Sequence, residues 1–178
     1  LTERAAALGD ERAQRQLHAL GGEIDARTWF APIELRQHHS APRIFTIEGF
    51  IPAAACAWFI DYAKRRLEPG TVRDGATGFD IVSAGRSAAI AGSSPLESDL
   101  VLQLTKLRIA QALDTPAAHQ EPTTFLRYQP GQEYLAHYDL IRPHEEAAAA
   151  EELRLLGQRV ATVLVYLNEG YAGGETHF

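Results

Sequence analysis

Two residues with complementary chemistry, His137 and Asp139, stand two positions apart in the C-terminal half of the chain. The composition of residues 133–140 predicts a strand, on which residues i and i+2 share a face about 6–7 Å apart. With one further His from another strand, this imidazole and carboxylate would form the 2-His-1-carboxylate site of Fe(II) oxygenases. Alone, a His-x-Asp pair is weak evidence, because it also occurs as a surface or hydrogen-bonded pair.

The elements that must position this pair follow from residue patterns. Gly9-Asp10 divides the helical pattern of residues 1–20 into two short helices, and Asp99 is a candidate cap for a later helix. That helix carries an apolar stripe of Leu100, Leu104, Leu107 and Ala110. A further helix is predicted over 52–67, and a short exposed helix or a mobile loop over 144–156. Strands are predicted over 44–49, 79–82, 123–128, 133–140 and 158–167. Helices thus precede a run of strands, which predicts an α+β fold with its sheet toward the C-terminus.

Four sequence segments, taken together and in their order along the chain, resemble the pattern of a known family. They are Ser83-x-x-Arg86-Ser87, RYQPGQEYLAHYD over 127–139, GQRVATVLVYLN over 157–168, and Gly-Gly-Glu-Thr over 173–176. Over roughly residues 43–178, this set resembles the prolyl 4-hydroxylases, which belong to the 2-oxoglutarate- and Fe(II)-dependent dioxygenases. The motifs are specific for the family but not for a substrate.

The resemblance implies a fold and a domain organisation. It implies a double-stranded β-helix, or jelly-roll, core with flanking N-terminal helices inside the predicted α+β class. Residues 23–178 would form the dioxygenase domain, and residues 1–22 an N-terminal helical cap. The pattern within 1–22 is similar to the tail of a Sel1-type helical repeat, although one unit is too little for an array.

The resemblance also implies roles for individual residues. His137 and Asp139 would be the first two iron ligands, with no catalytic residue expected beyond the metal ligands. Positions that bind 2-oxoglutarate in the family correspond to Tyr128, Tyr166 and Thr176. Weaker matches to substrate-contacting positions are Arg86 and Tyr134.

The implied activity is hydroxylation of a prolyl residue in a peptide or protein. The resemblance implies that Fe(II), 2-oxoglutarate and O2 take part, that 2-oxoglutarate is decarboxylated to succinate and CO2, and that ascorbate keeps the iron reduced. Three alternatives stay open: the same chemistry on a non-prolyl substrate, a catalytically inactive jelly-roll binding module, and a non-oxidative jelly-roll metalloprotein.

One part of the family pattern has no counterpart in this sequence. In the family, two residues follow the Gly-Gly-Glu-Thr motif: a His that is the third iron ligand, and a Lys or Arg that pairs with 2-oxoglutarate. This sequence ends at Phe178, before either position. His177 is a less favoured candidate for that ligand. The sequence has no methionine and starts at Leu1. We therefore expect trimmed ends or omitted methionines, a dioxygenase domain without its last strands, and no activity from this fragment alone.

Composition narrows the function classes. A formal net charge of −6 without a basic run argues against nucleic-acid binding. The longest apolar runs, 51–60 and 160–167, are too short to span a bilayer, so no membrane partner is predicted. A single cysteine, Cys56, excludes an internal disulfide framework and favours a cytoplasmic location. The oligomeric state is not predicted.

Overall fold

The structure is a computed structural model that describes residues 2–73, 80–82, 86–93, 99–142 and 147–178. The chain divides into two compact units, which are described separately. Unit 1 comprises residues 1–64, 93–123 and 165–169, and unit 2 comprises residues 65–92, 124–164 and 170–178. Ser83 of the first motif, Phe79 at the start of the predicted strand 79–82, and residues 144–146 of the segment 144–156 lie outside the described residues.

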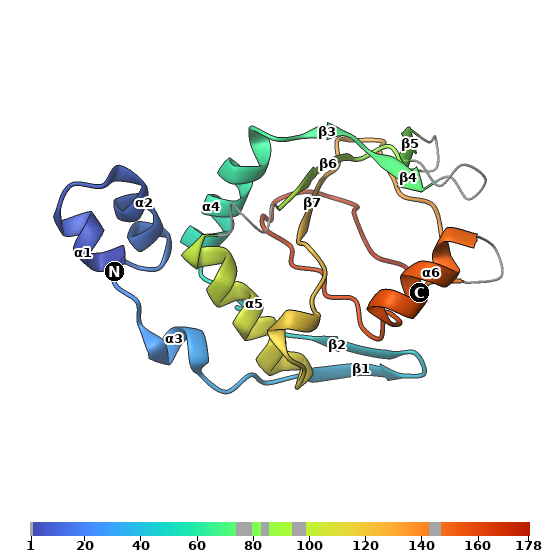
Figure 1. The fold of residues 1–178 in the computed structure, drawn as a ribbon, viewed down its shortest axis with the longest axis horizontal. Helices are drawn as coiled ribbons and strands as arrows, with labels where there is room; N and C mark the ends of the chain where they lie inside the picture. The colour runs from blue at the N-terminus through green and yellow to red at the C-terminus, as the bar shows by residue number, and fades with distance from the viewer. Residues whose placement is uncertain (1, 74–79, 83–85, 94–98, 143–146) are drawn as a thin grey trace. The chain divides into compact units, whose positions relative to one another are not determined.

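The N-terminal helices of unit 1 confirm the prediction of two short helices. Helix α1 (Thr2–Ala7) and helix α2 (Glu11–Ala19) lie side by side (Figure 1). Asp10 caps α2, because its Oδ1 accepts a hydrogen bond from the Ala13 amide at 2.7 Å. A third helix, α3 (Ala26–Phe30), follows and is capped in the same way by Asp25.

Two longer helices supply most of the core of unit 1. They are α4 (Ala53–Lys64) and α5 (Leu100–Leu113), and both were predicted. Asp99 joins them: Oδ1 accepts from the Leu102 amide at 2.9 Å, and Oδ2 accepts from Trp58 Nε1 at 2.8 Å. A buried carboxylate is tolerated here because both of its oxygens are hydrogen-bonded.

The buried face of α5 differs from the predicted apolar stripe. Leu104 is buried as expected, but Leu107 is 45% exposed, whereas Arg108 is buried. Arg108 donates hydrogen bonds to the carbonyl groups of Phe50, Thr28 and Trp29. These bonds offset the cost of burying the guanidinium. The buried face of the helix therefore includes Arg108 in place of Leu107.

Unit 1 also contains a small antiparallel hairpin. Strand β1 (Arg36–Ser40) pairs with β2 (Arg43–Thr46), with a bulge between Gln37 and His39. The hairpin overlaps the predicted strand 44–49. A short 3-10 helix, η2 (Ala117–His119), follows α5.

The described residues of unit 2 form two small antiparallel sheets and one helix. One sheet has the order β3 (Glu68–Pro69), β6 (Ala89–Gly92), β7 (Thr124–Arg127), and the other pairs β4 (Thr71–Arg73) with β5 (Asp80–Val82). Of the two alternatives predicted for residues 144–156, a helix or a loop, the described residues form the helix, α6 (Ala147–Leu156). Phe125, Ala91 and Ala88 are the buried apolar residues of the three-stranded sheet region. The predicted α+β class is therefore confirmed.

Two predicted strands, over 133–140 and 158–167, are not formed, so these two predictions are wrong. Residues 133–140 make one isolated bridge, between Tyr134 and Arg86, and residues 158–167 contain no strand. Val160 is 86% exposed. A strand needs a hydrogen-bonded partner, which β propensity cannot supply. Within the described ranges, no jelly-roll closure is seen.

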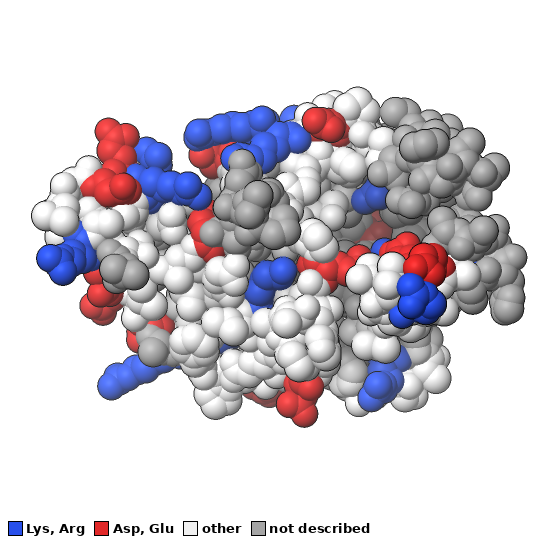
Figure 2. All heavy atoms as spheres, viewed as in Figure 1, with Lys and Arg blue, Asp and Glu red and all other residues white. Residues whose placement is uncertain are grey.

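The surface and the helix lengths add two observations. Figure 2 shows acidic and basic side chains interspersed over the face that it draws. Among the described residues, no helix is both long enough and apolar enough to cross a membrane.

Gly70 lies where the main chain between β3 and β4 approaches the end of β6. A Cβ atom added at Gly70 would collide with the carbonyl oxygen of Ala88. We expect Gly70→Ala to lower the free energy of unfolding by about 1–3 kcal/mol, because the backbone must move to remove this overlap. Urea denaturation measures the change.

Gly92→Ala is the matched control, because Gly92 lies in β6 and an added Cβ would meet nothing within 4 Å. We expect its unfolding free energy to stay within about 0.5 kcal/mol of the unchanged chain. Equal destabilisation by both substitutions would contradict the close approach at Gly70.

Candidate functional site

His137 and Asp139 face each other although their segment is not a strand. His137 Nε2 lies 3.3 Å from Asp139 Oδ1, and both side chains are partly exposed. The carbonyl of Leu135 lies 2.7 Å from His137 Nδ1 and accepts a hydrogen bond from it. In the neutral tautomer that this bond selects, the lone pair of Nε2 points away from Leu135 and is available to a ligand.

The spacing of these two atoms fits adjacent ligands of one metal ion. Nitrogen and carboxylate ligands bind divalent transition metals at about 2.0–2.2 Å, so neighbouring octahedral positions are roughly 3 Å apart. The 3.3 Å between His137 Nε2 and Asp139 Oδ1 is close to this value. His137 is held by a carbonyl through its other nitrogen, as metal-binding histidines commonly are.

An aromatic stack orients the His137 ring. The ring of Tyr134 lies 3.7 Å from that of His137, between centroids, with an interplanar angle of 26°. The guanidinium of Arg86 lies 4.8 Å from the centroid of the Tyr134 ring. Arg86, Tyr134, His137 and Asp139 therefore form a continuous row of side chains within unit 2. The side chains of Tyr134, His137 and Asp139 come from six consecutive positions of one segment.

Ser87 anchors the start of that segment. Its amide and its hydroxyl both lie 3.1 Å from the carbonyl oxygen of Glu133, and its hydroxyl accepts from the Glu133 amide at 2.9 Å. Before this contact, the chain turns at Gly131, whose φ of +81° favours glycine. The position of Tyr134 is thus fixed by the chain next to Arg86.

Three side chains of residues 158–162 hold the end of the segment. The amide group of Gln158 pairs with both main-chain groups of Ile141, at 2.8 Å and 2.9 Å. Arg159 Nη1 donates to the carbonyl oxygen of Asp139 at 3.0 Å. Thr162 Oγ1 donates to Asp139 Oδ2 at 2.5 Å. Side-chain hydrogen bonds thus connect two segments that the sequence predicted to be strands.

A hollow of about 490 Å³ lies beside the three-stranded sheet of unit 2. Arg86 lines this hollow, and its guanidinium also lies over the ring of Tyr134. Its Nη1 is 3.4 Å from the Thr71 carbonyl, and its Nε is buried without a hydrogen-bond partner within the described part of the chain. Arg127 and Gln132 are among the other lining residues. Polar and basic side chains therefore border the row that contains His137.

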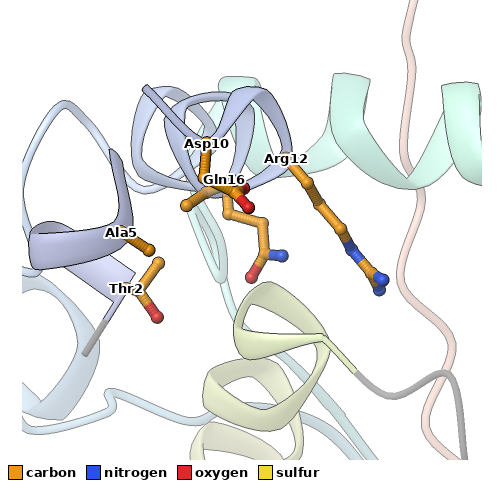
Figure 3. A pocket seen from close by; sticks show the side chains of 6 residues that line it. Thr2, Ala5, Asp10, Arg12 and Gln16 are labelled. Carbon is orange, nitrogen blue, oxygen red and sulfur yellow. Dashed lines mark hydrogen bonds between the residues drawn. The ribbon is translucent and has the colours of Figure 1, made fainter. Parts of the chain in front are cut away.

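A second hollow, of about 320 Å³, lies on helices α1 and α2 of unit 1. Figure 3 shows Asp10, Arg12 and Gln16 at this hollow, next to Thr2 and Ala5. Asp10 caps α2, and Gln16 accepts a hydrogen bond from the Leu100 amide at 3.1 Å. Both side chains serve the packing of unit 1, so this hollow is not a candidate catalytic site.

The other predicted site residues lie elsewhere on the chain. Tyr128 follows β7 and Thr176 lies in the last segment of unit 2, and both are exposed. Tyr166 is exposed and belongs to unit 1. Among the residues that the structure describes, no group of three or more His, Cys, Asp or Glu side chains is placed to hold a metal ion. His177 therefore does not join His137 and Asp139 here.

Sequence reasoning missed Gln158 and Thr162 as parts of this site. Both are polar residues within a run otherwise rich in β-branched and apolar residues. Their side chains can bond to main-chain groups and carboxylates nearby, and this was the available signal. The identity of the partner was not readable, because Asp139 and Thr162 are 23 positions apart.

The comparison with known proteins finds related plant sequences. The chain is 34% identical over 149 residues to probable prolyl 4-hydroxylase 7 of Arabidopsis thaliana, covering 84% of this chain and 45% of that protein. It is 31% identical over 172 residues to probable prolyl 4-hydroxylase 9 of the same plant, covering 96% and 56%. For prolyl 4-hydroxylase 1 the identity is 34% over 139 residues, covering 78% and 47%. The chain thus spans about half the length of these curated relatives. No protein-family model matches the chain.

The hydrogen bonds of Gln158 predict a local change in hydrogen exchange. We expect Gln158→Ala to accelerate exchange of the Ile141 amide about tenfold, because the amide loses its acceptor at 2.8 Å. Residue-resolved hydrogen exchange measures this effect.

Gln132→Ala is the matched control, since Gln132 Oε1 accepts from the Gln129 amide at 2.8 Å. It should accelerate exchange at Gln129 and leave Ile141 unchanged. An unchanged exchange rate of the Ile141 amide in Gln158→Ala would show that residues 139–141 are held by other contacts.

Proposed function

The chain is homologous to plant prolyl 4-hydroxylases over most of its length, and from this homology we propose that it acts in a 2-oxoglutarate- and Fe(II)-dependent dioxygenase. The proposed reaction is hydroxylation of a prolyl residue in a peptide or protein, coupled to decarboxylation of 2-oxoglutarate to succinate and CO2. The observation that supports it best is the pair of His137 Nε2 and Asp139 Oδ1, 3.3 Å apart in the motif that resembles the family's iron-binding segment.

In this proposal, His137 and Asp139 are two of the protein ligands of Fe(II). The fit rests on their spacing and on the Leu135 carbonyl, which in the neutral imidazole keeps the proton on Nδ1. An imidazole and a single carboxylate are a donor set suited to Fe(II) when a second histidine completes it. Bound iron would supply the redox chemistry that activates O2, while 2-oxoglutarate would supply two electrons through its decarboxylation.

Three residues are proposed to bind 2-oxoglutarate: Tyr128, Tyr166 and Thr176. Phenol and hydroxyl groups donate hydrogen bonds to carboxylates, which suits the end of 2-oxoglutarate that is remote from the metal. This assignment is supported by the sequence resemblance. The jelly-roll architecture that would bring the three residues together is part of the same proposal.

The substrate is proposed to bind beside Arg86 and Tyr134. Tyr134 stacks on His137, and Arg86 lines the hollow of about 490 Å³ next to it. A peptide in this hollow would present main-chain carbonyl groups to the guanidinium of Arg86 and its proline ring to an aromatic face. The hollow thus offers donors for a peptide, and Tyr134 lies between its Arg86 and the proposed ligand His137.

The proposal is tested by product formation in the full-length protein with Fe(II), ascorbate, 2-oxoglutarate and a proline-rich peptide. We expect succinate release that depends on 2-oxoglutarate and a peptide mass increase of one oxygen atom. Asp139→Ala should reduce both by at least about 10³-fold, because it removes a metal ligand rather than a supporting contact.

Glu48→Ala is the control for Asp139→Ala, since Glu48 is an exposed carboxylate of unit 1. Its turnover should equal that of the unchanged protein. Full activity in Asp139→Ala would refute the assignment of Asp139. Succinate release without peptide oxidation, tested over several amino-acid substrates, would instead favour a non-prolyl substrate.

A further inference from the structure

Thr162 makes a contact that the proposed function does not account for. Its hydroxyl donates a hydrogen bond to Asp139 Oδ2 at 2.5 Å, within the short range typical of hydroxyl–carboxylate bonds. The other oxygen of the same carboxylate, Oδ1, lies on the side of His137 Nε2. The two oxygens of Asp139 therefore have different partners.

We propose that Thr162 is a positioning residue that makes Asp139 a one-oxygen metal ligand. The inference rests on the proposed function, because it takes Asp139 as a ligand. With Oδ2 engaged by Thr162, Oδ1 is the oxygen that is directed to the ion shared with His137. A carboxylate held in this way occupies one coordination position instead of two, which leaves the neighbouring position open for a co-substrate.

The main chain around Asp139 is held by the same segment that carries Thr162. Arg159 fixes the Asp139 carbonyl, and Gln158 fixes both main-chain groups of Ile141. With the main chain held, the conformation of Asp139 can then change mainly by rotation of its side chain. The Thr162 hydroxyl restricts that rotation, since a hydrogen bond to Oδ2 fixes the plane of the carboxylate.

The experiment compares Thr162→Val with Thr162→Ser. Valine keeps the shape of threonine and lacks the hydroxyl, whereas serine keeps the hydroxyl. Co²⁺ replaces Fe(II) as an oxygen-stable probe, and its affinity for the full-length protein is measured by calorimetric titration. We expect Thr162→Val to weaken Co²⁺ binding about 10–100-fold, and Thr162→Ser to stay within about threefold, as for other residues that orient metal ligands.

X-ray absorption of the Co²⁺-loaded protein supplies a readout that a purely structural role would not change. The unchanged protein and Thr162→Ser should show one carboxylate oxygen from Asp139 at the metal, and Thr162→Val a second, longer one. Thr124→Val is the matched control, because Thr124 is an exposed threonine of β7 in unit 2. It should bind Co²⁺ like the unchanged protein.

The outcomes separate the two proposals. Equal Co²⁺ affinity in Thr162→Val and Thr162→Ser, with unchanged metal coordination, would overturn the role of Thr162 and leave the metal site standing. Co²⁺ affinity that is the same in the unchanged protein and in His137→Ala would overturn the metal site, and the role of Thr162 with it. Melting temperatures of the metal-free variants within about 2 °C of each other would exclude unfolding as the cause of a weaker affinity.

Discussion

The attachment of residues 158–162 to residues 139–141 is the constraint on which the candidate site depends. Asp139 lies in a segment without a strand ladder, so its main chain has no regular hydrogen-bond partners to fix it. The side chains of Gln158, Arg159 and Thr162 supply four hydrogen bonds to this segment instead. The amide of Gln158 acts like a peptide group, because it both donates to and accepts from Ile141. A ligand geometry can thus be held by side chains where a backbone ladder is absent.

Helices α1, α2, α4 and α5 were predictable because their signals are local. Gly9-Asp10 both ends one helix and caps the next, and Asp99 begins α5 as its position before an apolar run indicated. The buried face of α5 was less predictable, because it is set by Arg108 and its three carbonyl partners. These carbonyls belong to residues 28, 29 and 50, which lie in segments distant in sequence.

The strands were only partly predictable. Those predicted over 44–49, 79–82 and 123–128 overlap β2, β5 and β7. Residues 158–167 have the best strand composition in the chain and form no strand, whereas β3 and β6 pair with little strand propensity of their own. Their pairing requires close approach instead, since Gly70 leaves room for the Ala88 carbonyl. β structure depends on partners that are remote in sequence. A run such as 158–167 therefore indicates that a segment can form a strand, but not that a partner strand is present.

The His137–Asp139 pair was predictable for a reason that did not hold. The strand argument places residues i and i+2 on one face, and no strand is present at residues 133–140. The two side chains nevertheless meet, because His137 stacks on Tyr134 and Asp139 is held from residues 159 and 162. The spacing of a motif can therefore persist when the element that was expected to produce it does not form. The chemistry of the pair follows from the contacts that orient each ring and carboxylate, whatever secondary structure carries them.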